Sequence, residues 1–303
     1  MAGKSKRIHQ MTIAQWEATF PDEDACAAYL VAHRWPDGVH CPRCGNVKVY
    51  ELEHRAWSWQ CHECADHGYR FSHIAGTIFE NTNKPLREWF RVIHLMLTAK
   101  KSVSAMQVQR YMGFGSYKTA WYMCHRIRAA LVEREFQQLM GIVEADETFV
   151  GGKAKNKHRG KGRGDSGRGG TGSGKTPVAG AVTRKGNVVA RVVENVKGET
   201  LTQFIRESVS HKVSLLITDE WVGYHKVRQE YPSAVIQHTK GEYVVGAIHT
   251  NTIEGFWSLI KRSIVGSFHK VSKKYLPLYV AEAQFKYNNR ENADIFGTAI
   301  RGC

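Results

Sequence analysis

The sequence predicts a multidomain protein of α+β and α/β class, built from a small cysteine-rich module, a helical region and a mixed-sheet core. Three observations support this prediction. Four of the seven cysteines form two closely spaced pairs within residues 36–75. Apolar residues recur at helical spacing through residues 84–138. From residue 141 short apolar runs alternate with turn residues, as strands do. At 303 residues the chain has room for two or three such units.

Composition restricts the class of partner. The 43 Lys and Arg outnumber the 28 Asp and Glu, and the formal net charge is +15. Such a chain attracts polyanions, nucleic acid first and acidic membrane surfaces second. No apolar run approaches the roughly 20 residues that a membrane span needs, and MAGKSKRIHQ lacks the apolar stretch of a secretory signal. We therefore expect a cytoplasmic protein whose cysteines are thiols or metal ligands rather than disulfides.

The cysteine-rich zone, residues 36–75, has the spacing of a structural metal site. CPRCG and CHEC each place two cysteines at C-x-x-C spacing, and 16 residues separate the two pairs. Knuckles of this kind bring four thiolates to one tetrahedral zinc at about 2.3 Å, which leaves no open position for catalysis. We predict one structural Zn²⁺ in a zinc ribbon, with these ligands: Cys41, Cys44, Cys61 and Cys64. The alternatives are free thiols, redox-active pairs, or ligation by the nearby His62, His67 and His73.

Helices are expected on both sides of the ribbon. Residues 10–35 form a small helical lead-in, and residues 84–138 contain successive helices. The segments on either side of the turn GFGS resemble a helix-turn-helix. The helix after that turn carries residues suited to a DNA groove or to phosphates: Tyr117, Lys118, His125, Arg126 and Arg128. The alternative is an ordinary helical bundle with a solvated basic face.

A segment rich in Gly and basic residues, 152–176, separates the first two expected strands. It has too few apolar residues to offset the entropy lost on ordering, so we expect a flexible basic insert. Its end, GGTGSGKT, fits the pattern of a phosphate-binding loop, but that loop needs a strand before it and a helix after it. Because Pro177 and a strand-like run follow, we interpret the match as fortuitous.

Three carboxylates fall at positions that a metal site would use. Asp146 lies in the strand IVEADETFV, Asp219 ends the apolar strand VSLLIT, and Glu254 lies on a helix over about 251–262. A carboxylate at the end of so apolar a strand is costly unless it is solvated, paired or metal-bound. Together the three could hold two Mg²⁺ ions about 3.5–4 Å apart, the arrangement used for in-line displacement at phosphorus. The alternative is a turn acid, a surface acid and the solvated face of a helix. Neighbouring acids could replace one of the three: Glu144, Glu147 and Glu220.

These features resemble the DDE transposases, whose catalytic core is RNase H-like. The order strand–strand–strand–helix–strand–helix from residue 141 is similar to that core. The 34 residues between Asp219 and Glu254 are typical of the superfamily, and Lys261 matches a basic residue that such enzymes place two helical turns later. Several motifs resemble one group, the ISXO-like bacterial insertion-sequence transposases with an N-terminal zinc ribbon. The resemblance, ribbon included, spans about residues 20–290, and these motifs carry it: AGTIFENTNKPLREWF, DETFVGGK, TDEWVGY, HTNTIEGFWSLIKR and YVAEAQFKYNNR.

The resemblance implies an RNase H-like catalytic domain over residues 141–291. Its triad would be Asp146, Asp219 and Glu254, binding two Mg²⁺ (or Mn²⁺) ions. Members of the group have either Asn or Glu as the third residue, and Asn251 is the other candidate. We prefer Glu254 because a carboxylate brings charge to a hard cation, with Asn251 as an auxiliary ligand or DNA contact. Lys261 and Arg262 would contact DNA.

The implied activity is binding of the terminal inverted repeats of an insertion sequence, followed by Mg²⁺-dependent cleavage. The 3′-OH that cleavage frees then attacks a target phosphodiester in a transesterification, without a covalent protein intermediate. A catalytically silent, transposase-derived DNA-binding protein and an RNase H-type nuclease are the alternatives. The expected partners are double-stranded DNA and at least one further copy of the chain, without a membrane, at the bacterial nucleoid.

Overall fold

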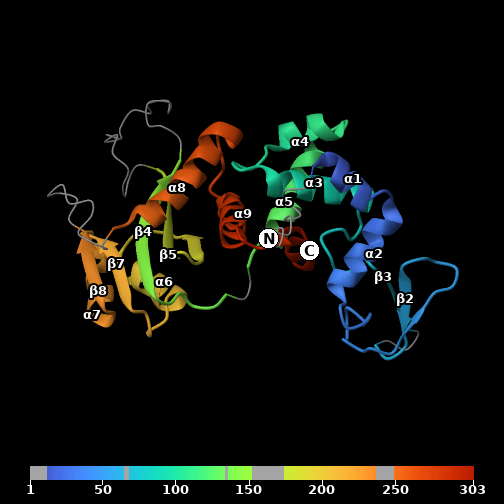
Figure 1. Cartoon of the computed structure of the whole chain (residues 1–303), viewed down its shortest axis with the longest axis horizontal. Helices are drawn as coiled ribbons and strands as arrows, with labels where there is room; N and C mark the ends of the chain where they lie inside the picture. The colour runs from blue at the N-terminus through green and yellow to red at the C-terminus, as the bar shows by residue number, and fades with distance from the viewer. Residues whose placement is uncertain (1–11, 65–67, 134–135, 152–173, 237–248) are drawn as a thin grey trace, which may run out of the picture. The chain divides into compact units, whose positions relative to one another are not determined.

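The structure, a computed structural model, describes residues 12–64, 68–133, 136–151, 174–236 and 249–303. The chain divides into two compact units, one formed by residues 1–132 with 291–303 and the other by residues 133–290 (Figure 1). Each unit is described below by itself. Within the described ranges, no helix combines the length and apolar character that crossing a membrane requires.

The first unit has a helical core made from both ends of the chain. Helices α1 (Ile13–Thr19) and α2 (Glu23–Arg34) are capped by the side chains of Thr12 and Asp22. Helix α3 (Leu86–Thr98) buries most of its apolar residues. The last helix, α10 (Ile295–Arg301), returns to this core.

Contacts with aromatic side chains of the first unit hold α10 in place. Phe296 of α10 is 0% exposed, and its ring lies 5.5 Å from that of Phe20 and 5.4 Å from that of Phe90. The Asp294 side chain caps the helix by accepting a hydrogen bond from the Gly297 N–H at 2.8 Å. Burial of these apolar side chains stabilises a helix of only seven residues, which would be marginal alone.

The cysteine-rich zone forms a small antiparallel sheet in the order β1 (Val49–Glu51), β2 (Ser58–Cys61) and β3 (Tyr69–Ser72). Its own core is small and aromatic. The Trp35 ring lies 5.6 Å from Trp59 and 6.1 Å from Phe71. So little apolar area is marginal for stability without a further crosslink.

Two short helices follow α3. Helix α4 (Ala105–Met112) is capped by Ser104 and ends at Gly113, whose φ of 67° is a left-handed conformation that favours glycine. Helix α5 (Tyr117–Ala130) is capped by Ser116, whose side chain accepts a hydrogen bond from a backbone N–H of the first turn. These are the two helices that the sequence predicts around the turn GFGS.

The second unit is built on a five-stranded mixed sheet with the order β6-β5-β4-β7-β8. The strands are β4 (Ile142–Val150), β5 (Thr176–Thr183), β6 (Val188–Val192), β7 (Leu215–Asp219) and β8 (Ser233–Ile236). The first three along the chain are antiparallel neighbours, whereas β7 runs parallel to β4 and β8 runs parallel to β7. The parallel pairing brings the end of β7 beside the central strand β4.

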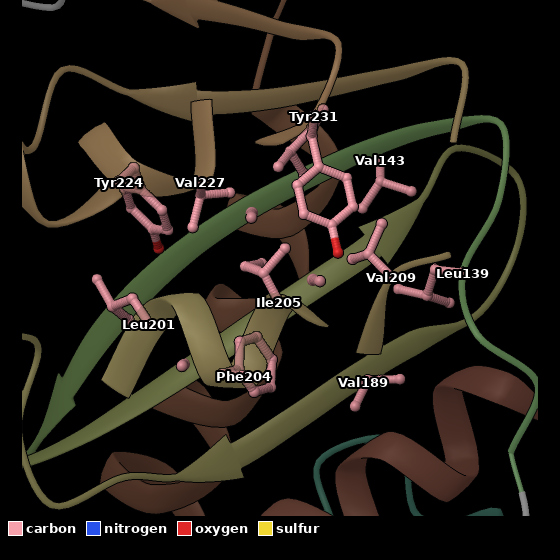
Figure 2. Packing of buried hydrophobic residues seen from close by; sticks show 14 of the residues in the cluster. Leu139, Val143, Val189, Leu201, Phe204, Ile205, Val209, Tyr224, Val227 and Tyr231 are labelled. Atoms are coloured by element: carbon pink, nitrogen blue, oxygen red, sulfur yellow. The ribbon is translucent and has the colours of Figure 1, made fainter. Parts of the chain in front are cut away.

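Helices cover both faces of this sheet. On one face α6 (Gly198–Ser208) and the short α7 (His225–Glu230) pack on Val143 and Ala145 of β4. Figure 2 shows Leu201, Phe204 and Ile205 of α6 in that cluster. On the other face lie α8 (Asn251–Ser263) and α9 (Leu276–Asn288), and a short π-helix (Ile264–Phe268) continues α8. The two clusters follow from the period-two alternation of the strands.

The edge of the sheet at β6 is closed by side chains of α9. The N–H of Val188 donates to Asn288 Oδ1 and that of Ala190 donates to Gln284 Oε1, both at 2.8 Å. Asn288 Nδ2 in turn donates to the Val188 carbonyl at 3.0 Å. These amides satisfy backbone groups that an open edge strand leaves unpaired.

The predicted insert lies outside the described residues up to Ser173. Thr176 begins β5, so a strand rather than a helix N-terminus follows the Gly-Lys-Thr sequence. The helix that a phosphate-binding loop requires is therefore missing at this point of the described chain.

Candidate zinc centre and carboxylate site

The four predicted zinc ligands lie together in the ribbon. The sulfur atoms of Cys41, Cys44, Cys61 and Cys64 all lie within 4.8 Å of one another. The distances are 3.9 Å between Cys41 and Cys64 and 3.7 Å between Cys44 and Cys61. A tetrahedron of sulfurs at about 2.3 Å from zinc has edges of about 3.8 Å. The donor set therefore fits a structural Zn²⁺, and the ribbon supplies it from two tight turns.

Asp146 lies in the middle of the central strand β4, on the face covered by α8. Its carboxylate accepts a hydrogen bond from the Trp257 indole N–H, with 3.0 Å between Nε1 and Oδ2. Burial and the charge of Asp219 raise the pKa of Asp146 from 3.8 to about 6, and Glu254 contributes in the same direction. Both of the other predicted acids are thus within electrostatic reach of Asp146.

Asp219 ends β7, the parallel neighbour of β4. Its Oδ1 accepts a hydrogen bond from the Trp221 N–H at 3.0 Å, so the carboxylate also shapes the turn after the strand. The Arg228 guanidinium holds the same turn. It donates to Thr218 Oγ1 at 3.2 Å, to the Trp221 carbonyl at 3.1 Å and to the Asp219 carbonyl.

Glu254 lies in the first turn of α8, where the positive end of the helix dipole favours a carboxylate. The Thr250 hydroxyl donates to Glu254 Oε1 at 2.9 Å. The helix exposes one polar face, made of Asn251, Glu254, Ser258 and Lys261. The helix that the sequence predicts is present, and it presents Glu254 to solvent while Ile253, Phe256 and Trp257 face the sheet.

The flanking acids have other partners. Glu144 is 0% exposed and accepts hydrogen bonds at the N-terminus of α8. Glu147 accepts a hydrogen bond from the Tyr224 hydroxyl at 2.9 Å. Burial, then the charges of Asp219 and Asp146, raise its pKa from 4.5 to about 7. Glu220 is exposed beyond the end of β7.

A hard divalent cation suits this acidic group, because carboxylate oxygens are its usual ligands and its charge offsets their repulsion. Among the described residues, the four cysteines are the one group of at least three His, Cys, Asp or Glu side chains found close enough together to hold a metal ion.

The DNA-binding residues predicted on α5 need correction. Arg128 is 1% exposed and its guanidinium lies 3.5 Å from the Val103 carbonyl, so the prediction that it contacts DNA is wrong. Arg126 is half-buried and donates to the Glu80 carbonyl at 3.2 Å. Lys118 is exposed in the first turn of α5, and Lys261 and Arg262 are exposed near the end of α8.

Sequence reasoning missed the residues that hold the acids in place: Trp257, Tyr224 and Arg228. Trp257 and Tyr224 contact residues 111 and 77 positions away, so local spacing carries no signal for them. Arg228 contacts the turn only 7–10 residues before it, but the sequence does not show that its side chain folds back onto that turn. A tryptophan three residues after Glu254 on the same helix was visible, but only the fold shows that it faces Asp146.

The class of protein follows from these two parts, a four-cysteine ribbon and a mixed α/β core with clustered acids. Residues 21–67 match the transposase zinc-ribbon domain, and residues 138–288 match the ISXO2-like transposase domain. The chain belongs to the ISXO2-like insertion-sequence transposases, and the resemblance seen in the sequence is confirmed.

Two relatives illustrate the family. An "Uncharacterized protein in transposable element ISH50" of Halobacterium salinarum is 27% identical over 277 residues, which cover 88% of this chain and 92% of the relative. An "Uncharacterized transposase-like protein" of Haemophilus influenzae is 31% identical over 108 residues, or 35% of this chain and 85% of the relative. No solved structure matches the chain.

Proposed function

We propose that this transposase binds the terminal inverted repeats of its element and catalyses metal-dependent cleavage and strand transfer, with Asp146, Asp219 and Glu254 as the catalytic acids. The observation that carries the proposal is the placement of these residues: Asp146 and Asp219 lie on adjacent parallel strands, and α8, which packs on the face of Asp146, carries Glu254. The charges of Asp219 and Glu254 both act to raise the pKa of Asp146. Acids scattered over the surface would be too far from Asp146 for their charges to add to the effect of burial on its pKa.

The sheet supports the same proposal. Three antiparallel strands, then a helix and a parallel strand beside the first, followed by helices on the other face, resemble an RNase H-like core. In an open sheet with parallel strands, functional groups gather at the carboxyl ends of those strands. Asp219 lies at such an end. The proposed catalytic domain covers residues 141–291.

Each acid has a distinct environment for the chemistry. Asp146 Oδ2 accepts a hydrogen bond from the Trp257 indole N–H. Glu254 is exposed on α8, where a nucleic-acid strand has access. Two Mg²⁺ ions, when bound, would supply the Lewis acidity that activates the attacking oxygen and offsets charge at phosphorus. Asn251, one turn before Glu254, is an auxiliary ligand or a DNA contact.

Exposed basic side chains follow Glu254 along the chain. Lys261 and Arg262 end α8, and Lys270, Lys273 and Lys274 follow the π-helix; all five are exposed. From Gly255 to Ala281 the sequence contains no Asp or Glu. Among the ion pairs of the described residues, none involves these five side chains. Such a surface fits the phosphates of DNA.

Recognition of the element ends is assigned to the first unit. The zinc ribbon (36–75) and the helical region (84–138) carry Lys118 on an exposed helix start, where phosphate contacts are favourable. Joining two element ends to one target requires at least two copies of the chain on DNA.

The test uses Asp146→Asn, Asp219→Asn and Glu254→Gln, which remove charge and keep side-chain size. Each should keep end binding and lose Mg²⁺-dependent cleavage and strand transfer by at least about 1,000-fold, or about 4 kcal/mol of barrier. The matched control is Glu207→Gln, an exposed acid of α6 in the same unit. Cleavage by all three variants at the wild-type rate would contradict the proposal. Wild-type protein that binds ends and never cleaves would favour the catalytically silent alternative.

The third catalytic residue is decided by comparing Glu254→Gln with Asn251→Ala in a plasmid excision assay. We expect the first to abolish excision and the second only to reduce it, because a neutral amide brings only a dipole to the metal. Lys261→Ala should weaken DNA engagement and leave metal binding unchanged. Excision by Glu254→Gln but not by Asn251→Ala would assign the role to Asn251.

A further inference from the structure

Glu144 is a buried acid that the proposed chemistry does not use. It lies two residues before Asp146 on β4, and its side chain is 0% exposed. Burying a carboxylate costs several kcal/mol unless its oxygens are satisfied. Its partners therefore indicate what the fold gains from it.

Those partners are the first residues of α8 and Arg184, which directly follows β5. Glu144 Oε2 accepts hydrogen bonds from the N–H groups of Thr252 at 2.9 Å and Ile253 at 3.1 Å. Its Oε1 accepts from the Thr252 hydroxyl and the Arg184 guanidinium, at 2.9 Å and 2.8 Å. Arg184 also donates to the His249 carbonyl at 3.0 Å, just before the helix.

This arrangement replaces the usual local cap. The N-cap residue of α8, Thr250, makes no capping hydrogen bond, and its hydroxyl donates to Glu254 instead. A side chain at the N-cap would satisfy the same N–H groups just as well. A cap provided by β4 adds something that a local cap cannot, because it fixes the helix start to the strand that carries Asp146.

A second contact lies one turn further along α8. The Trp257 indole N–H donates to Asp146 Oδ2, and Trp257 is three residues after Glu254. The strand next to β4 has Gly180 opposite Asp146, where a Cβ atom would lie 2.5 Å from the Trp257 ring. The sheet is thus shaped to admit this ring at the acidic site.

We propose that Glu144 and Trp257 are positioning residues that fix α8 on β4, so that Glu254 and Asp146 are held in the geometry that binds the metal ions. Glu144 sets the start of the helix and Trp257 sets its rotation, with Glu254 between the two contacts. The inference rests on the proposed function. In this proposal the two residues raise the affinity of the site for metal ions and do not contact the substrate.

The test measures Mn²⁺ binding by electron paramagnetic resonance on the full-length, zinc-loaded chain. Glu144→Gln removes the charge and one acceptor oxygen, and Trp257→Phe removes the indole N–H while keeping an aromatic ring. Each should weaken Mn²⁺ binding about 10- to 100-fold, the usual effect of losing an outer partner of metal ligands. Glu207→Gln, an exposed acid on α6, should bind as the wild type does.

Thermal unfolding without Mn²⁺ separates positioning from stability. A purely structural role would lower the melting temperature and leave the Mn²⁺ affinity of the folded protein unchanged. That result in both variants would overturn the inference. If Glu144→Gln does not fold, Trp257→Phe alone decides by the same criterion.

Asp146→Asn distinguishes this inference from the proposed function. If that variant loses Mn²⁺ binding while Glu144→Gln and Trp257→Phe keep it, only the positioning role is wrong. If Asp146→Asn binds Mn²⁺ as tightly as the wild type, the proposed metal site is wrong and the positioning role falls with it.

Discussion

Asp146 and Glu147 are adjacent in sequence and lie in different environments. Asp146 faces Trp257, and Glu147 faces Tyr224. Burial raises the pKa of both acids, and the charge of Asp219 adds to each shift. At neutral pH the fold therefore holds Asp146 ionised against its preference. A bound cation would relieve that cost, as expected of a functional site rather than of a structural one.

This cost predicts the pH dependence of stability without added Mg²⁺. The pKa of Asp146 is raised from 3.8 to about 6 on folding, so its ionisation destabilises the fold; the penalty grows as the pH rises from 3.8 to about 6 and is nearly constant above that. Asp146→Asn removes the penalty. Its free energy of unfolding should exceed that of the wild type by about 3 kcal/mol at pH 8 and by about half of that at pH 5.

The measurement is urea unfolding of zinc-loaded protein, followed in the unit that contains Asp146. Glu207→Gln is the control, because its pKa is lowered by hydrogen bonds from Gln203 and Arg191 and its loss should give no gain at pH 8. A difference between Asp146→Asn and wild type that does not change with pH would show that the charge of Asp146 is not destabilising.

Gly180 gives a second prediction for a single residue. Gly180→Ala would place a Cβ atom 2.5 Å from the Trp257 ring and 3.2 Å from Ile253, so α8 must shift. We expect a loss of about 1–3 kcal/mol in unfolding free energy and weaker cleavage. Gly255→Ala on α8 is the control, since no atom lies within 4 Å of its added Cβ and it should be neutral or stabilising. Equal effects of the two substitutions would rule out the steric argument.

Individual elements were largely predictable because their signals are local. The polar stripe from Asn251 to Lys261 and the apolar run ending at Asp219 place a helix and a strand that the structure contains. Contacts between distant residues were not predictable. Arg128 is a basic residue of the kind that contacts DNA, yet its side chain is buried. The sequence could not show this, because periodicity does not reveal which basic residue on a helix faces the core. The role of Glu144 depends on a partner more than 100 residues away.

The zinc ribbon gives a prediction for one element. Its aromatic core is too small to be stable alone, so zinc ligation should supply the folding energy. The wild-type chain should contain about one zinc by metal analysis. Cys41→Ser should lose the metal, unfold β1–β3 and reduce binding to element ends. Cys303→Ser, which changes a cysteine outside the ribbon, should keep the zinc, the folded strands β1–β3 and the binding to element ends. Folded, metal-free wild-type protein with full DNA binding would contradict this prediction.

At the scale of the whole molecule, the path of the chain makes the stability of the N-terminal unit depend on the C-terminal residues. The unit of residues 133–290 is inserted between two segments that both belong to the other unit. The C-terminal segment is not a tail, because α10 contributes Ile295, Phe296 and Ile300 to the helical core, each at most 2% exposed. The family match ends at residue 288, so the match itself did not indicate that the last residues complete the N-terminal unit.

Removing residues 291–303 should therefore destabilise the distant N-terminal unit and spare the unit that is adjacent in sequence. Phe296→Ala is the finer test: the ring contacts Phe20, Tyr29 and Phe90, and its loss should cost about 3–5 kcal/mol. Calorimetry should show two transitions, of which only the one for the N-terminal unit shifts to lower temperature. Tyr122→Ala, at a side chain that is 64% exposed in the same unit, should shift neither. If end recognition resides in the N-terminal unit, Phe296→Ala should weaken end binding at temperatures where Mn²⁺ binding is unchanged. A shift of the other transition alone would mean that α10 stabilises the catalytic unit instead.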